Sequence, residues 1–213
     1  MLDFFCDQAP WSEPLAEGAV VLRRRALAQA EMLMEQIQHI AAQNPFYHRI
    51  TPGGHRMSVA MTHCGDAGWF SHTSGYHYSR QDQEQERQWP SIPVSFRHLA
   101  SEAAHEAGFA QFTPDVCLIN RYEPGARLTL HRDKDERDLR QPIVSVSLGL
   151  PALFLFGGFE RQAAVKRILL EHGDVVIWGG QSRLRYHGIL PVRPGIHPLV
   201  GALRYNLTFR KAL

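Results

Sequence analysis

The chain has 213 residues, a formal net charge of +2, and 44% hydrophobic and 21% charged residues, which are the proportions of an ordinary soluble globular protein. This length allows one substantial core, and no apolar run approaches the length of a membrane span. The small net charge permits a nucleic-acid partner without arguing for one, because a net charge does not reveal a clustered basic patch.

The cysteines indicate a reducing compartment. Cys6, Cys64 and Cys117 are few, odd in number and far apart in the chain, which fits neither a disulfide framework nor a zinc knuckle. Residues 1–7 carry acidic side chains where a signal peptide would carry basic ones. We therefore expect a cytoplasmic protein.

The first half of the chain predicts two helices and one short strand. Residues 17–23 are typical of a turn that leads into a strand. Apolar side chains then recur at three- and four-residue spacing across residues 27–41, and Asn44-Pro45 ends this amphipathic pattern. A second helix is predicted between Pro93 and Gly108.

Between the two helices, residues 51–78 are rich in glycine and aromatic residues. Pro52-Gly53-Gly54 predicts a tight turn, and residues 57–62 alternate like a strand. Glycines are then interleaved with ring side chains, namely Trp69, Phe70, Tyr76, His77 and Tyr78. On an irregular backbone such a segment suits a mobile flap that stacks on a planar ligand. It equally suits a satellite hydrophobic cluster beneath a loop.

The second half of the chain predicts many short strands. They are expected at residues 116–122, 127–131, 143–150, 152–156, 166–170, 175–178, 183–190 and 203–210. The first two are expected to form a hairpin around the turn at residues 123–126. Many short strands with no helices between them indicate an antiparallel sandwich or jelly roll.

A metal site is indicated by His131 and Asp133. In an extended strand these side chains project from the same face, so that an imidazole and a carboxylate can hold one metal ion. His187 is the candidate third ligand. It would complete the triad of two histidines and one carboxylate that binds Fe(II) and leaves positions open for a co-substrate and dioxygen. Alone, the His-x-Asp pattern is weak in a chain with 12 histidines.

The last predicted strand separates polar from apolar side chains. One face carries Arg204, Asn206, Thr208 and Arg210, and the other carries Tyr205, Leu207 and Phe209. If the apolar face packs on the helices, the two arginines point into the roll, where they would be costly without an anionic ligand. The alternative places them on a solvated outer face, and then no anion site exists.

Together these motifs resemble the AlkB family of iron(II)/2-oxoglutarate-dependent dioxygenases, bacterial enzymes that oxidatively dealkylate DNA and RNA bases. The resemblance covers nearly the whole chain, including residues 51–54, 57–62, 118–122, 142–151, 172–176 and 204–210. It implies an α+β, mainly β fold, with a double-stranded β-helix (jelly roll) core. Residues 1–112 would form N-terminal helices and a nucleotide-recognition flap packed on the core at residues 113–213, as one structural unit.

The resemblance also implies roles for individual residues. Fe(II) would be held by His131, Asp133 and His187, and 2-oxoglutarate by Asn120, Tyr122, Arg204, Asn206 and Arg210. The substrate would be bound by Trp69, Tyr76, His77, Tyr78, Asp135 and Arg161, with Lys134 nearby. Asp135 would accept from the exocyclic amino group of the base. His55 stands where the family pattern leads us to expect a phenol, and no role is transferred to it.

The implied activity is DNA repair. The enzyme would demethylate 1-methyladenine and 3-methylcytosine, converting 2-oxoglutarate and O2 to succinate and CO2 and releasing formaldehyde. Its partner would be alkylated DNA, preferably single-stranded, with RNA as a further candidate, and we expect a monomer. One alternative is an Fe(II)/2-oxoglutarate hydroxylase of a protein or a small molecule. Another is a metal-stabilised jelly roll that binds nucleic acid without turnover.

Overall fold

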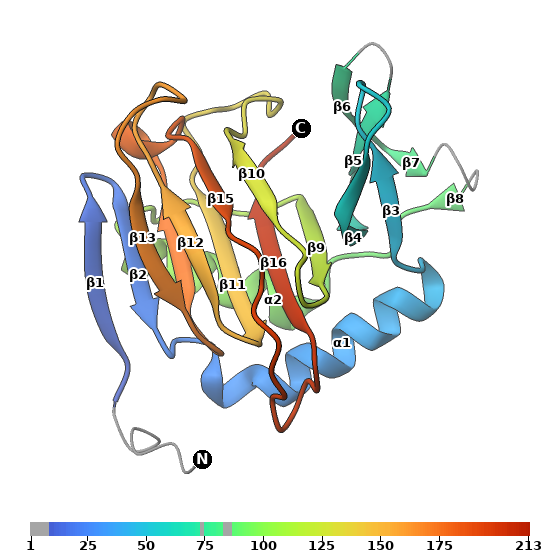
Figure 1. Ribbon diagram of the computed structural model, residues 1–213, viewed down its shortest axis with the longest axis horizontal. Helices are drawn as coiled ribbons and strands as arrows, with labels where there is room; N and C mark the ends of the chain where they lie inside the picture. Colours follow the sequence, from blue (N-terminus) through green and yellow to red (C-terminus); the bar gives the residue numbers. More distant parts are fainter. Residues whose placement is uncertain (1–8, 73–74, 83–86) are drawn as a thin grey trace.

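The computed structural model describes residues 9–72, 75–82 and 87–213, so the expectations for residues 1–7 and Cys6 lie outside the described residues. Two antiparallel sheets form the centre of the molecule (Figure 1). The larger sheet contains, in spatial order, β1 (Trp11–Ala16), β2 (Ala19–Arg23), β14 (Val175–Trp178), β11 (Ile143–Gly149), β16 (Arg204–Arg210), β9 (Val116–Tyr122), β4 (Arg56–Gly65) and β3 (Tyr47–Ile50). The smaller contains β10 (Leu128–His131), β15 (His187–Ile189), β12 (Ala152–Phe156) and β13 (Lys166–Leu170).

The remaining elements are helices and two small hairpins. The α-helices are α1 (Ala30–Gln43) and α2 (Val94–Glu106), and the 3-10 helices are η1 (Leu27–Gln29) and η2 (Gly180–Ser182). The hairpins pair β5 (Gly68–His72) with β6 (Gly75–Ser79), and β7 (Gln81–Asp82) with β8 (Arg87–Gln88). No helix in the described part of the chain is long and apolar enough to cross a membrane.

The helices cover the outer face of the larger sheet. One hydrophobic cluster contains the buried stripes of α1 and α2 together with side chains of β11 and β16. In β16, Leu207 and Phe209 face these helices, and the Phe209 ring meets Phe96 of α2 edge to face at 6.0 Å. The polar side chains of the same strand are buried on the other face. The predicted division of this strand into an apolar and a polar face is therefore confirmed.

A second hydrophobic cluster lies between the two sheets. Met61, Tyr122 and Trp178 of the larger sheet pack with Phe154 and Ile189 of the smaller one. The expected mainly β fold with helices on one side is thus confirmed. Strands from both halves of the chain share the larger sheet, since β1 to β4 pair alongside β9, β11, β14 and β16. This pairing also brings Cys64 and Cys117 to directly opposed positions, as buried free thiols.

Three local predictions were wrong. Residues 116–122 and 127–131 do not form a hairpin, because both neighbours of β9 are other strands, β16 and β4, and the turn carries the chain across to the smaller sheet. The aromatic flap is a regular β5–β6 hairpin rather than irregular backbone. In the segment 183–190 only residues 187–189 are a strand. Strand β1 was not predicted; it contains Pro14, which an edge strand tolerates because edge amides need no partner.

Candidate active site

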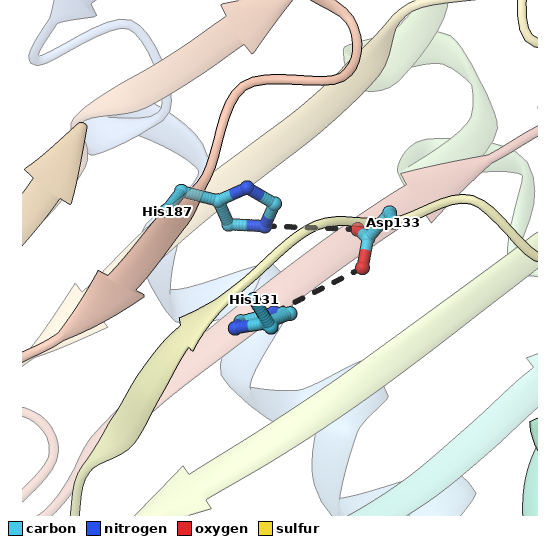
Figure 2. A group of neighbouring side chains, drawn as sticks. All are labelled: His131, Asp133 and His187. Atoms are coloured by element: carbon cyan, nitrogen blue, oxygen red, sulfur yellow. Dashed lines mark ion pairs between the residues drawn. The ribbon is translucent and has the colours of Figure 1, made fainter. Parts of the chain in front are cut away.

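Two strands of the smaller sheet bring the predicted metal ligands together. His131 is the last residue of β10 and lies directly opposite His187, the first residue of β15. Asp133 lies beyond the end of β10, as the predicted strand at residues 127–131 implies, so strand alternation does not by itself place it beside His131. Its carboxylate oxygens are nevertheless 3.9 Å from Nε2 of His131 and 3.8 Å from Nε2 of His187 (Figure 2). The three possible ligand atoms all lie within 4.8 Å of one another.

Hydrogen bonds prepare both histidines as metal ligands. Nδ1 of His131 lies 2.8 Å from the Thr129 carbonyl, and Nδ1 of His187 lies 3.1 Å from the Arg185 carbonyl. Since a carbonyl only accepts, each Nδ1 donates, and the Nε2 lone pairs face Asp133. Burial, reinforced by the neighbouring His131, lowers the pKa of His187 to about 3. Neutral imidazole is the form that binds a metal, so this donor set fits Fe(II).

Arg210 holds the third ligand in its charged form. Burial alone would raise the pKa of Asp133, but the Arg210 guanidinium and the two histidines hold this pKa well below its usual range. Arg210 donates to one oxygen of Asp133 from Nη2 at 2.5 Å and from Nε at 2.9 Å. The carboxylate is therefore ionised and its orientation is fixed, as a metal ligand requires.

A cavity of about 220 Å³ adjoins the triad and is lined by all five residues expected to bind 2-oxoglutarate. Arg204 is 0% exposed, and it donates to the Leu150 carbonyl at 3.2 Å and the Ser147 hydroxyl at 2.8 Å. Its Nε, the Tyr122 hydroxyl and the Asn120 Oδ1 have no hydrogen-bond partner among the described residues. Burial lowers the pKa of Arg204 to about 10. A buried cation without a carboxylate partner in the described part of the chain, beside the unpaired Tyr122 hydroxyl, fits an anionic ligand.

The comparisons agree with this geometry. The chain matches the family model of the 2OG-Fe(II) oxygenase superfamily over residues 18–210. It is 60% identical over 212 residues to the alpha-ketoglutarate-dependent dioxygenase AlkB of Escherichia coli (strain K12), which covers 100% of this chain and 98% of that protein. The chain belongs to the AlkB family of dioxygenases.

A more distant relative and a solved structure also match this chain. The AlkB homolog of Caulobacter vibrioides (strain NA1000 / CB15N) is 41% identical over 181 residues, or 84% of this chain and 80% of that protein. A solved structure titled "The structure of OsALKBH1" superposes with a TM-score of 0.84 at 29% identity, covering 94% of this chain and 100% of that chain. This AlkB-family chain is therefore an Fe(II)- and 2-oxoglutarate-dependent dioxygenase; alpha-ketoglutarate is the older name of the same co-substrate.

In this AlkB-family enzyme the β5–β6 hairpin closes one side of the cavity. Trp69 stacks on Tyr76 with ring centroids 4.7 Å apart, and its indole Nε1 donates to Asp135 Oδ2 at 3.2 Å. Tyr78 lies directly opposite Trp69 in the hairpin and also lines the cavity. Because side chains alternate along a strand, His77 lies on the other face, where its ring stacks on Phe70.

Arg161 and His55 also lie outside the cavity. Arg161 is exposed in the connection between β12 and β13, and its guanidinium donates to the Leu130 carbonyl. His55 is exposed in the turn before β4, where its backbone N–H donates to the Thr51 hydroxyl. Arg161 thus stands at the rim of the site beside β10, whereas His77 is not brought to the site at all.

Sequence reasoning missed Glu136 and Arg183. Glu136 is buried and accepts from the Tyr78 hydroxyl at 2.8 Å and from Arg183 at 2.9 Å. It also lies 3.3 Å from Nε of Arg210. Arg183 donates in addition to the Asp133 carbonyl at 2.7 Å. This network joins the hairpin to the segment that carries Asp133, but in the sequence Glu136 looks like one more charge in a solvated run.

The Tyr78 hydroxyl anchors the β5–β6 hairpin, and its removal should weaken substrate binding. Tyr78→Phe deletes a hydrogen bond to a charged acceptor, so we expect the KM for an oligonucleotide substrate to rise about 10-fold. The KM for 2-oxoglutarate should not change, because Tyr78 does not contact Arg204. Steady-state kinetics with each substrate varied separately will measure both. Tyr205→Phe, on the helix-facing side of β16, is the matched control, and an unchanged oligonucleotide KM in Tyr78→Phe would contradict this role.

Buried histidines should make the metal-free protein sensitive to mild acid. Burial lowers the pKa of His63 well below 6.5, and burial together with His197 lowers the pKa of His172 to about 4. Below about pH 6.5 these histidines are protonated in the unfolded chain but stay neutral in the folded protein. The free energy of unfolding therefore falls as the pH falls toward their folded-state pKa values. We expect the free energy of unfolding to drop by up to about 1.4 kcal/mol per pH unit for each such histidine. Urea unfolding between pH 7 and 5 tests this, with a shallower drop expected in His63→Gln.

Proposed function

We propose that this dioxygenase repairs alkylated DNA by oxidative demethylation of 1-methyladenine and 3-methylcytosine, with single-stranded DNA preferred and RNA as a second substrate. The observation that carries the proposal is an anionic and aromatic pocket, made by Asp135, Trp69 and Tyr76, beside the metal triad. Bound Fe(II), with 2-oxoglutarate and O2, would supply oxidation of the N-methyl carbon, with succinate, CO2 and formaldehyde as products.

The residues of the triad and the cavity have separate tasks in this proposal. His131, Asp133 and His187 hold Fe(II). Arg204 pairs with a carboxylate of 2-oxoglutarate, because its planar guanidinium group matches a carboxylate and no carboxylate among the described residues pairs with it. Tyr122 donates to the same co-substrate from a hydroxyl that is otherwise unpaired, and Asn120 donates from its side-chain NH2 group, because the co-substrate carries only acceptors. Asn206 bonds to Ser145 and Val146, and Arg210 to Asp133, so both support the site from the strand beneath it.

Base recognition rests on charge and stacking. Both proposed bases are cationic at neutral pH, and the Asp135 carboxylate favours a cation over an unmodified neutral base. The Trp69 indole donates to Oδ2 of Asp135, and the other carboxylate oxygen can accept from the exocyclic amino group of the base. Extrusion of the base costs a few kcal/mol and least in single strands, which supports the strand preference. Both α-helices bury their apolar stripes within the chain, which supports a monomer. A DNA substrate supports a location in the bacterial cytoplasm.

Asp135 should determine which bases are accepted. In Asp135→Ala we expect kcat/KM for 3-methylcytosine to fall about 10- to 100-fold, because a charge-assisted hydrogen bond is lost in a partly desolvated pocket. Succinate formation without nucleic acid should persist. Competition between 3-methylcytosine and a neutral methylated base in one oligonucleotide will measure the selectivity. Equal selectivity in the variant and the parent would remove Asp135 from base recognition.

A single turnover assay tests the proposed function. The protein, Fe(II) and 2-oxoglutarate are mixed under argon with a short single-stranded oligonucleotide that carries one 3-methylcytosine, and air is then admitted. We expect the oligonucleotide to lose the mass of one methyl substituent while formaldehyde appears in equal amount. If 2-oxoglutarate is consumed while the oligonucleotide mass stays constant, the substrate assignment is wrong.

A further inference from the structure

A group of stacked aromatic and cationic side chains lies at the edge of the cavity, on the side away from the β5–β6 hairpin, and one of them, Arg132, also lines the cavity. Phe159 and Arg161 belong to the connection between β12 and β13, Arg185 and Tyr186 precede β15, and Arg132 follows β10. We call these five residues the rim patch. In Figure 1 this connection lies to the left of β10 and β15, and β5 and β6 lie to their right. A chain that enters the site between them would pass the rim patch.

The rings and guanidinium groups of the rim patch form two stacks. The Arg185 guanidinium carbon lies 4.9 Å from the centre of the Phe159 ring and 5.6 Å from that of Phe156. The corresponding carbons of Arg132 and Arg161 lie 5.4 Å and 5.9 Å from the centre of the Tyr186 ring. Tyr186 precedes the metal-ligand candidate His187, and Arg161 donates to the carbonyl of Leu130, the neighbour of His131, so the Tyr186 stack lies beside the metal site.

The positive charge of the rim patch is not neutralised within the protein. None of its three arginines pairs with a carboxylate in the described part of the chain; Arg161 and Arg185 donate to the Leu130 and Gly157 carbonyls and to the Ser182 hydroxyl. Other arginines, such as Arg23 and Arg183, have carboxylate partners. Glu160 is the one acidic residue in the connection and offsets at most one of the three arginines, which leaves an excess of positive charge in the rim patch. Such a surface attracts a polyanion.

Phe159 adds a ring that can take a further stacking partner. Its side chain is 52% exposed, although large apolar side chains normally avoid water. Arg185 stacks against it, and that arginine is itself held by two hydrogen bonds, so the ring is supported from within the protein. Uncompensated arginines interleaved with an exposed aromatic ring are the means by which proteins bind single-stranded nucleic acid, through phosphate contacts and base stacking.

We propose that the rim patch binds the single-stranded segment that flanks the extruded base, with one unpaired flanking base stacked on Phe159 and the backbone phosphates on Arg161 and Arg185. This inference rests on the proposed function and deepens it. The β5–β6 hairpin and the rim patch would then contact the nucleic-acid strand on the two sides of the metal site. We therefore expect the effect of Phe159 to depend on the length of the substrate, because a mononucleotide reaches the pocket without contacting Phe159.

The first test compares Phe159→Ala with Leu169→Ala, an apolar side chain of β13 that is 47% exposed. Fluorescence anisotropy with an unmodified single-stranded oligonucleotide should show about 10-fold weaker binding for Phe159→Ala, and parental binding for Leu169→Ala and Phe159→Trp. Parental affinity in Phe159→Ala would overturn the proposal. This measurement needs no turnover, so it decides the proposal even if the demethylation assay fails.

The second test separates the rim patch from the base pocket. The KM for a 3-methylcytosine oligonucleotide should rise about 10-fold in Phe159→Ala, whereas turnover of the 3-methylcytosine mononucleotide should not change. An equal loss on both substrates would show that Phe159 supports the base pocket and would overturn the proposal.

A third test concerns the phosphate contact of Arg185. Arg185→Gln should lower the slope of log affinity against log salt concentration by about 0.7, with Arg193→Gln as the control. An unchanged slope in Arg185→Gln would remove its phosphate contact and overturn that part of the proposal.

Discussion

Replacing His131 by alanine is expected to abolish turnover while the protein still binds single-stranded oligonucleotide. The substitution leaves one histidine and one carboxylate to hold Fe(II). Loss of a residue that merely supports a metal ligand already costs about 10- to 100-fold, so we expect activity to fall at least about 100-fold on loss of a ligand itself. His131 is the informative position, because its side chain is 38% exposed and the protein should fold without it. Asp133 also neutralises Arg210, so its removal would leave a buried cation with one carboxylate fewer.

Succinate formation and Fe(II) affinity should be measured together for His131→Ala. His98→Ala, on the exposed side of α2, is the matched control and should retain both properties of the parent. Oligonucleotide binding should stay unchanged in both variants, since the hairpin and the rim patch remain intact. Parental turnover in His131→Ala would show that the metal is held elsewhere and would refute the triad.

The second large effect is expected at Arg204. Arg204→Met keeps most of the side-chain volume but removes a fully buried cation of the cavity that has no carboxylate partner among the described residues. Loss of a buried charged hydrogen-bonding partner typically costs 2–5 kcal/mol, so the KM for 2-oxoglutarate should rise by about 100-fold or more. The KM for the oligonucleotide should change little. The added thermal stability that 2-oxoglutarate gives the parent protein should also disappear.

Arg204→Lys distinguishes charge from shape. A lysine keeps the positive charge but cannot present two parallel donors to a carboxylate, so an intermediate KM for 2-oxoglutarate is expected. If Arg204→Met bound 2-oxoglutarate as well as the parent does, the co-substrate would have to lie at another place in the cavity, and the assignment of Tyr122 and Asn120 would fail with it.

Local patterns predicted much of this protein, because strand alternation and helical stripes depend only on neighbouring residues. The polar face of β16 was visible from its alternation alone, and it led to Arg204. Strand partners were not visible: residues 116–122 and 127–131 looked like a hairpin because a turn joins them, yet β9 is matched along its whole length by β16. The roles of Glu136 and Arg183 depend on contacts between segments 47 residues apart, and no local pattern reports those.

The β5–β6 hairpin forms a two-stranded sheet of its own and meets the metal-bearing segment mainly through side chains, Trp69 to Asp135 and Tyr78 to Glu136. The backbone hydrogen bonds between β5 and β6 are therefore separate from those between β10 and β15, which align the metal ligands. The stacking contacts to the substrate can diverge by exchange of this short hairpin, provided that the two anchoring side chains are kept, whereas the selection of cationic bases by Asp135 stays with the core. A chimaera that carries the hairpin of a relative should therefore change its affinity for oligonucleotides while it keeps the iron chemistry and the preference for cationic bases.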